Sequence, residues 1–525
     1  MPRVLPAQLK GTIHTDGLDV SEQKAEVMAQ HLGLVFSNPY LSLVHILVED
    51  DVAFGPANLN LSVEEIQKRV KYAIEACRLQ GFEKRSTSDL SGGEMQAVAI
   101  AGIMAMLTPI MALDEPYTML DPLGKETVRR ALEYTSNNTQ NTLIFAEAGS
   151  DIGYFSRSVD RIAILHQGRI LAVDEPRKIL SDMELMDKIG IKPPQVTRLF
   201  TEYNIPSSKV PISVEEGIEE IRKLYEANRV EFNKFVKPKR AQVKEGTEPI
   251  IKVRNLHHTF PGAGGGVKAL QGIDLDIYPG EIVAIIGQNG SGKTTTSFHL
   301  VGLQKPTNKD AIVMVDGRDA TKLSVRQVIQ SINYAFQNPD AQLSMEFIGE
   351  EIAYGLKLMD VPEDQIDQKV DDVLKEFGME DMKELPLMQA SLDLKRFTTI
   401  ACLMVLEPKI LILDEPTNGL DHEGGTRVME TMKRLNKEKD MTFIFITHNM
   451  EMVAQYASRI VVLKEGKILL DGPPDEVFQQ TDILQSTYLN SPQMTRISQA
   501  LKDIGCPQGI TTISDMNQVL KVKET

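Results

Sequence analysis

The stretch that decides the fold is EIVAIIGQNGSGKTTT, residues 281–296. An apolar run, a glycine-rich turn and the onset of a helix follow one another, which is the context in which the pattern GxxxxGKS/T indicates a phosphate-binding loop. The glycines let backbone N–H groups surround a phosphate chain, Lys293 can neutralise the outer phosphates, and the Thr294 hydroxyl can bind Mg²⁺. We therefore expect a nucleotide site built from Gly287, Gln288, Asn289, Gly290, Ser291, Gly292, Lys293, Thr294 and Thr295.

A second buried-strand pattern, KILILDEP at 409–416, ends in two carboxylates. Asp414 is expected to hold Mg²⁺ through water, and Glu415 to polarise the attacking water as a general base. The structural alternative is a strand that ends in a solvated acidic pair. Gln337 follows a short strand, where its amide can sense the metal and the water, and His448 follows TFIFIT, where its imidazole can contact a γ-phosphate. Either residue alone would more often be structural, and the order of the motifs favours the functional interpretation.

The aromatic residue Phe260, in HHTFPGAG, precedes the phosphate loop by about the distance at which a ring can stack on adenine. A core phenylalanine would look the same. The candidate Mg²⁺ ligands are Thr294, Gln337 and Asp414.

A shift of 300 residues aligns most of the two halves of the chain, and such self-similarity indicates repeated domains. MALDEPYTMLDP (111–122) matches LILDEPTNGLDH (411–422), and VFSNPYLSL (35–43) matches AFQNPDAQL (335–343). We predict a first copy without its phosphate loop, its C-terminal extension with a charged linker, a complete second copy and a final extension, over 1–190, 191–248, 249–480 and 481–525.

Two features of this organisation have alternatives. The charged connector around 213–248 can be a plain solvated linker or can pack against the domains, and the sequence favours neither. Met1 aligns with Val301, past the phosphate loop of the second copy. We expect that the true start lies upstream and that Met1 is an internal methionine, rather than that the domain is naturally this short.

Composition limits the class of protein. The chain has 525 residues, 42% of them hydrophobic and 25% charged, which is typical of globular domains. The net charge of −16 argues against a nucleic-acid surface as the main partner. The three cysteines are far apart, so neither disulfides nor a thiolate metal site are expected.

The chain also carries LSGGEMQ at 90–96. A phosphate loop, a Gln loop, LSGGE, LDEP, LDP or LDH and a His loop, in that order, resemble the ATP-binding-cassette (ABC) ATPases. FQNPDAQL, VEDDVAFGP and PPQVTRL resemble the energy-coupling-factor (ECF) group, which imports vitamins and metal ions. The resemblance implies an α/β fold with two P-loop NTPase domains of ABC type in tandem, the first truncated at its N-terminus. It also implies ATP and Mg²⁺ as cofactors, and two composite ATP sites, each with the phosphate loop of one cassette and the signature of the other.

This geometry places the sequence defects at one site. The first composite site has Ser37 and Ala148 at the Gln and His positions, and Ser391-Leu392-Asp393 in its signature. Leu392 adds bulk where glycine is expected. Asp393 adds a like charge that repels phosphate by about 4 kcal/mol at about 4 Å and an effective dielectric of about 20. The second site keeps every part, with the opposite cassette contributing Ser91, Gly92, Gly93 and Asp121, so we expect hydrolysis there alone.

The resemblance implies an ATP-hydrolysing importer subunit that associates peripherally with the cytoplasmic face of the membrane. Transmembrane energy-coupling and substrate-binding subunits would be its partners, and no nucleic-acid partner is expected. The halves would pair head to tail within one chain or between two copies. The alternatives are a soluble tandem ATPase that acts on ribosomes or nucleic acid, and a regulatory subunit without turnover. Segments 38–58 and 338–358 would contact the membrane subunits, and segments 190–225 and 488–520 would pair the cassettes.

Overall fold

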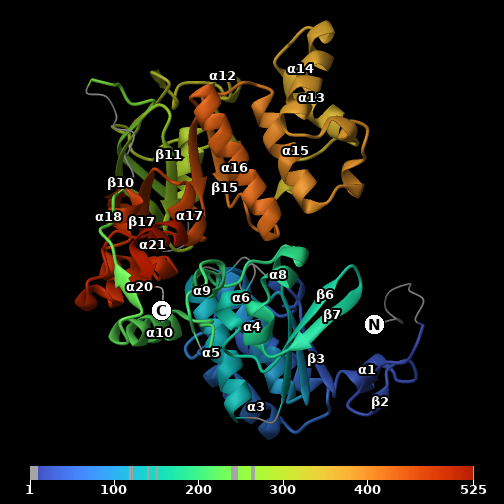
Figure 1. Ribbon diagram of the computed structural model, residues 1–525. Coiled ribbons are helices and arrows are strands. Elements are labelled where there is room, and N and C mark those ends of the chain that lie inside the picture. Colours follow the sequence, from blue (N-terminus) through green and yellow to red (C-terminus); the bar gives the residue numbers. More distant parts are fainter. Residues whose placement is uncertain are drawn as a thin grey trace. The chain divides into compact units, whose positions relative to one another are not determined.

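The computed structural model describes residues 10–90, 92–117, 120, 122–138, 141–148, 152–207, 209–237, 246–261 and 266–523. The chain divides into two compact units, Met1–Ser158 and Val159–Thr525. Figure 1 shows both units coloured along the sequence. No described helix has the length and apolar character that a membrane span requires.

A six-stranded sheet organises the larger unit. Its strand order is β14 (Ile332–Ala335), β15 (Ile410–Asp414), β16 (Thr442–Ile446), β11 (Ile282–Ile286), β17 (Arg459–Lys464) and β18 (Lys467–Gly472). The first five strands are parallel, and β18 pairs antiparallel with β17. Every residue of β11, β15 and β16 is buried, as expected for parallel strands covered on both faces.

Alternate residues of these strands enter two different cores. Ala284, Leu411 and Phe443 pack with helices on one face, whereas Val283, Ile410 and Ile444 pack with an antiparallel sheet on the other. That second sheet has the order β10 (Val267–Ile277), β9 (Ile251–Phe260), β12 (Ile312–Val315) and β13 (Arg318–Asp319). The helices of the first face are α13 (Ile348–Leu358), α14 (Glu363–Glu376), α15 (Leu392–Met404), α16 (His422–Lys439) and α17 (Met450–Tyr456), whereas α11 (Lys293–Leu300) and α12 (Val325–Val328) pack in the core with the antiparallel sheet.

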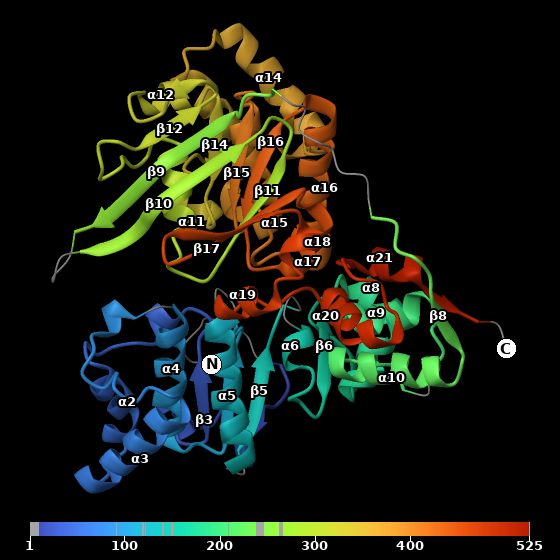
Figure 2. The same cartoon turned by 90° about the vertical axis from the view of Figure 1, so that its left-hand side faces the viewer.

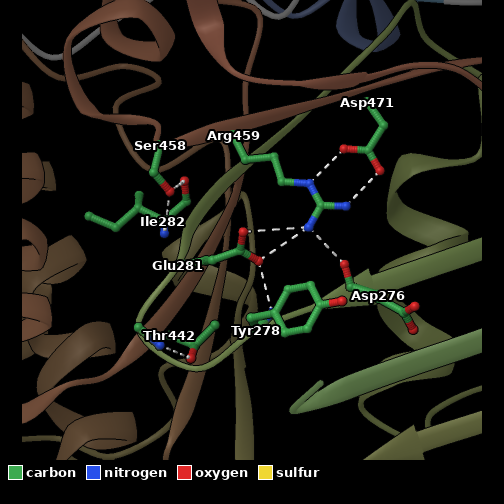
Figure 3. A network of polar contacts seen from close by, with 9 residues as sticks. Asp276, Tyr278, Glu281, Ile282, Thr442, Ser458, Arg459 and Asp471 are labelled. Carbon is green, nitrogen blue, oxygen red and sulfur yellow. Dashed lines mark hydrogen bonds and ion pairs between the residues drawn. The ribbon is translucent and has the colours of Figure 1, made fainter. Parts of the chain in front are cut away.

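A polar network fastens the end of β11 that lies opposite the phosphate loop (Figure 3). The Arg459 guanidinium donates to both carboxylate oxygens of Asp471, at 2.6 and 2.7 Å, and to the Asp276 carbonyl at 2.9 Å. It also lies 3.3 Å from Glu281, the residue before β11. The network therefore joins β17, β18 and β10 to the base of the central strand.

The smaller unit repeats part of this plan. Its parallel sheet has the order β3 (Leu32–Val35), β4 (Ile110–Asp114) and β5 (Thr142–Ala146). Within the described residues β5 pairs only with β4, whereas β16 lies between two strands. Ile144 is accordingly 53% exposed, whereas Ile444 is fully buried. The other elements are β1 (His14–Thr15), β2 (Leu18–Asp19), α1 (Ala25–Met28), α2 (Val48–Ala57), α3 (Val63–Ala76), α4 (Gly92–Met106), α5 (Pro122–Asn138) and α6 (Ile152–Phe155).

The two C-terminal extensions pack on each other within the larger unit. The two extensions lie side by side in Figure 2, and their buried side chains form one cluster that includes Leu199, Ile221, Ile497 and Met516. The elements of the first extension are α9 (Gln195–Glu202), α10 (Val214–Glu226) and β8 (Val230–Phe232), and those of the second are α20 (Gln493–Ala500), α21 (Ile513–Val519) and β19 (Leu520–Val522). Strand β8 pairs antiparallel with β19.

This packing decides the question of the charged connector for its helical part. Helix α10 buries Val214, Ile221 and Leu224 in the cluster, so this part of the connector is not a plain solvated linker. Residues 238–245 of the connector lie outside the described residues. The remaining elements of the larger unit are β6 (Ile162–His166), β7 (Arg169–Asp174), α7 (Pro176–Ser181), α8 (Met183–Ile189), α18 (Pro474–Val477) and α19 (Thr481–Ser486).

Candidate ATP site

The phosphate loop connects β11 to α11 and depends on its glycines. Gly287 and Gly292 have φ angles of +152° and +101°. A Cβ on Gly287 would lie 2.3 Å from the Leu463 carbonyl oxygen, and one on Gly292 would lie 2.8 Å from that of Ala269. Only glycine therefore fits these two positions without a shift of the backbone.

Lys293 brings a positive charge into this loop. It is 7% exposed, and its Nζ donates to the carbonyl oxygens of Gly287 at 2.7 Å and Gln288 at 2.9 Å. The Ser291 hydroxyl oxygen is buried without a hydrogen bond. Asn289, Gly290 and Thr294 are exposed, and Gln288 and Thr295 are partly buried. The loop thus combines a buried cation with accessible residues, as a phosphate site requires.

Asp414 ends β15 next to the start of α11. Its Oδ2 accepts from the Thr294 hydroxyl at 3.3 Å and from the Tyr334 hydroxyl at 2.5 Å. Burial raises the pKa of the carboxyl group, and the two hydrogen bonds oppose that shift. The structure thus brings together two of the candidate Mg²⁺ ligands, a carboxylate and a hydroxyl, which are oxygen donors of the kind that Mg²⁺ prefers.

Hydrogen bonds to its backbone N–H and to one of its two carboxylate oxygens hold Glu415 in place. Its φ angle is +46°, and its N–H donates to the Ile446 carbonyl at 2.8 Å. The Thr447 hydroxyl donates to Oε2 at 3.1 Å. The other oxygen, Oε1, is buried without a hydrogen bond, and it lies 3.5 Å from His448 Nε2.

The electrostatics of Glu415 suit a proton acceptor near neutral pH. Burial, followed by the charge of Asp414, raises the pKa of Glu415 to about 7. A general base works best when its pKa lies near the operating pH. A buried, unfilled acceptor oxygen beside an imidazole can take a proton from a water molecule.

The other two predicted contacts of the second copy are only partly formed. Gln337 is exposed, and its backbone carbonyl oxygen accepts a hydrogen bond from Arg396 Nη2 at 2.8 Å. Phe260 ends β9 with 37% of its surface exposed, and its ring lies edge-on to His258 at 4.5 Å. The Phe260 side chain is therefore only partly covered.

The signature glycines have two different environments in the smaller unit. A Cβ on Gly93 would lie 2.8 Å from the Cα of Gly124, whereas nothing lies within 4 Å of one on Gly92. The sequence predicts that both glycines admit a phosphate. In the structure Gly93 also lets α4 pack closely on α5, because a Cβ there would collide with Gly124. Ser91 and Asp121 lie outside the described residues.

The degenerate signature of the second copy has a different geometry. Leu392 is 38% exposed, and its Cδ2 lies against Gly419. The Asp393 carboxylate lies against Gly424, and burial and then the charge of Asp421 raise its pKa. The large side chain of Leu392 and the carboxylate of Asp393, both predicted from the sequence to disfavour a phosphate, therefore lie in the first turn of α15.

The acidic pair of the first copy keeps the backbone but not the environment. The Glu115 N–H donates to the Ala146 carbonyl at 2.8 Å, as Glu415 does to Ile446. Asp114 is exposed, however, whereas Asp414 is buried. Burial of the first carboxylate of the pair therefore distinguishes the second copy from the first.

Three residues of the site escaped the sequence motifs. Tyr334, Arg396 and Thr447 all contact the Gln loop or the carboxylate pair. Their counterparts at a shift of 300 are Leu34, Gln96 and Glu147. A comparison of the two copies at buried positions would have identified them.

Comparison with known proteins assigns this chain to a family. A family model described as ABC transporter matches residues 4–118 and 270–418. The chain belongs to the ABC transporter ATPases. It is 32% identical to a protein of Caldanaerobacter subterraneus subsp. tengcongensis, over 95% of this chain and 87% of that protein. It is 33% identical to one of Methanosarcina acetivorans, over 100% of this chain and 86% of that protein. Both are provisionally named ABC transporter ATP-binding proteins.

Solved structures include similar ABC proteins. The cbiO1 protein of Clostridium perfringens, described as part of the ABC transporter complex cbiONQ, is 35% identical, with a TM-score of 0.41 over 46% of this chain and 94% of that one. The family match in two segments and the relatives identify the chain as an ABC-type ATPase with two cassettes in tandem, as the motifs predicted.

Proposed function

We propose that this ABC ATPase is the ATP-hydrolysing subunit of an importer of the ECF type. It would couple hydrolysis at one composite site to uptake of a vitamin, a metal ion or a similar small solute through membrane partners. The observation that carries the catalytic part is Glu415 Oε1, a buried acceptor without a hydrogen bond, 3.5 Å from His448 Nε2. The first copy has alanine at the position of His448.

In this proposal Lys293 and the loop N–H groups bind the ATP phosphates, and Phe260 stacks on adenine. Thr294, Asp414 and Gln337 would hold Mg²⁺, which would neutralise charge on the phosphates. Glu415 accepts the proton of the attacking water, and His448 orients that carboxylate.

The signature of the first cassette completes the site. Ser91, Gly92, Gly93 and Asp121 would approach the γ-phosphate, and the open space beside Gly92 supports this role. The second signature would serve the other site, where Leu392 and Asp393 disfavour a phosphate. One site therefore turns over and the other is silent.

A surface on the first cassette supports a protein partner. Its Gln-loop segment exposes large apolar side chains, namely Tyr40 at 71%, Val44 at 63%, Ile46 at 76% and Phe54 at 46%. Such clusters on a protein surface mark interaction sites. We propose that this segment contacts a cytoplasmic loop of a transmembrane subunit, which would locate the chain peripherally at the cytoplasmic face. The change Ile46→Asp should then release the protein from membranes without loss of ATP binding.

The test compares matched glutamates in the two cassettes. Glu415→Gln should abolish ATP hydrolysis by the purified complex and solute uptake by cells, and Glu115→Gln should leave both nearly intact. Equal activity of the Glu415→Gln variant and the wild type would refute the catalytic assignment. Fractionation tests the importer assignment, because recovery with ribosomes instead of membranes would favour a soluble ATPase that acts on translation.

A further inference from the structure

The second cassette contains a buried arginine that the motifs of the family do not explain. Arg396 lies on α15, within the degenerate signature segment, and is 2% exposed. Its Nη1 donates to the Phe336 carbonyl at 3.0 Å, and its Nη2 donates to those of Gln337 at 2.8 Å and Asn418 at 3.5 Å. All three acceptors are backbone carbonyls.

These carbonyls belong to two segments of the ATP site. Phe336 and Gln337 form the Gln loop, which follows β14, and Asn418 lies three residues after Glu415. One guanidinium group therefore connects the Gln loop with the segment that follows the catalytic carboxylates. Its planar fork suits this role, because it offers several N–H donors in fixed directions.

The first copy shows that a charge is not required to attach this helix. Gln96 occupies the equivalent position, is 1% exposed, and donates to the Phe36 carbonyl at 3.5 Å. A neutral amide thus makes the link to the first of the three carbonyls. What arginine adds is the reach to the other two and a positive charge.

Burial of that charge is costly unless other charges compensate for it. Within the described residues no ion pair closer than 4 Å involves Arg396, and its Nε is buried without a partner. Burial lowers the pKa of Arg396, and the charges of Glu415 and Asp414 oppose that shift. The positive charge of Arg396 thus favours the charged forms of Asp414 and Glu415. Its hydrogen bonds hold the Gln loop and the segment that follows Glu415.

We propose that Arg396 is a positioning residue of the ATP site in its own cassette, where it fixes the Gln loop against the carboxylate pair and offsets the negative charge that gathers there. The proposal rests on the proposed function of Glu415 and Asp414. The proposal gives helix α15 a role. This helix lacks the signature glycines, but through Arg396 it still supports the ATP site of its own cassette.

The test uses the residue that the first copy already carries. Arg396→Gln keeps the link to Phe336 and should fold, since Gln96 does so in the same setting. We expect kcat to fall about tenfold and the Mg²⁺ concentration for half-maximal activity to rise several-fold, with the KM for ATP within about twofold. Arg396→Lys keeps the charge but not the fork, and should recover part of kcat.

Arg427→Gln is the matched control. Arg427 lies on α16, and its guanidinium lies 4.1 Å from the centre of the Phe397 ring of α15, the helix that carries Arg396. This contact is outside the site, so the variant should keep wild-type kinetics. Wild-type kcat and Mg²⁺ dependence in the Arg396→Gln variant would overturn the proposal. So would a parallel loss of kcat and thermal stability in both glutamine variants.

A second measurement separates this proposal from the proposed function. If the wild-type complex hydrolyses no ATP, the proposed function fails. The Mg²⁺ dependence of ATP binding, measured by calorimetry without turnover, then decides the role of Arg396. A weaker dependence on Mg²⁺ in the Arg396→Gln variant supports the proposal, and an unchanged dependence refutes it.

Discussion

The change Glu415→Gln should have opposite effects on turnover and on stability. Burial and the charge of Asp414 raise the pKa of Glu415 from 4.5 to about 7, and one unit corresponds to about 1.4 kcal/mol. Between these two pH values the folded chain keeps a proton that the unfolded chain has released. This contribution to stability is therefore fully present below the unfolded pKa and is lost as the pH rises through the folded one.

A glutamine side chain stays neutral throughout this range. At about pH 8 the variant without nucleotide should be more stable than the wild type by up to about 3 kcal/mol, and at about pH 4 the two should converge. The Glu415 side chain is 14% exposed, so screening by solvent is limited. Turnover should fall by about 10²- to 10⁴-fold, because the amide cannot accept a proton from water.

Thermal unfolding at several pH values and a steady-state ATPase assay measure both effects. Glu115→Gln is the control, since Glu115 lies beside an exposed Asp114 and the first copy has Ala148 at the position of His448, so both effects should be small. Loss of stability together with activity at about pH 8 would refute the argument, because it would mean that the charged carboxylate stabilises the fold. A stability gain that does not depend on pH would refute it as well.

Three further changes test the rest of the site and the fold. Ser91→Arg should abolish hydrolysis in the purified complex, because the larger arginine side chain would block the signature of the composite site. Intact hydrolysis in this variant would rule out the asymmetric arrangement. Tyr334→Phe removes the donor to Asp414 and should raise the Mg²⁺ requirement several-fold, by about 1 kcal/mol, while an unchanged Mg²⁺ titration would contradict that role. Arg459→Met leaves the Asp471 carboxylate without its bidentate partner and should cost about 2–4 kcal/mol in urea unfolding; a loss below about 1 kcal/mol would show that the network in Figure 3 contributes little.

The sequence predicted the strands and the order of the catalytic motifs because local patterns define both. The apolar runs at 282–286, 410–414 and 442–446 are the buried parallel strands, and Asp414 and His448 lie at their carboxyl ends. Parallel strands bring such ends to one edge of a sheet, so the proximity of these candidate residues followed from the strand assignments.

The supporting residues could not be predicted in the same way. Tyr334 reaches Asp414 across 80 residues of sequence, and Arg396 reaches Phe336 across 60. The first contact depends on the pairing of β14 with β15, and the second on the packing of α15 beside β14, and no local pattern specifies either. Likewise, Gly93 looks like a phosphate ligand in the sequence, and only the approach of Gly124 shows its packing role.

The paired extensions have a kinetic consequence. The first and second extensions belong to the same polypeptide and pack on each other. The Val196 N–H of the first donates to Gln493 Oε1 of the second at 3.0 Å. A cassette tethered to its mate meets it at a local concentration set by the chain, on the order of millimolar for short flexible linkers, and not by the amount of protein in the cell. Pairing of the two cassettes of one chain would therefore make closure on ATP a first-order event. The specific activity of this ATPase should stay constant on dilution, whereas an enzyme assembled from two separate cassettes would lose activity.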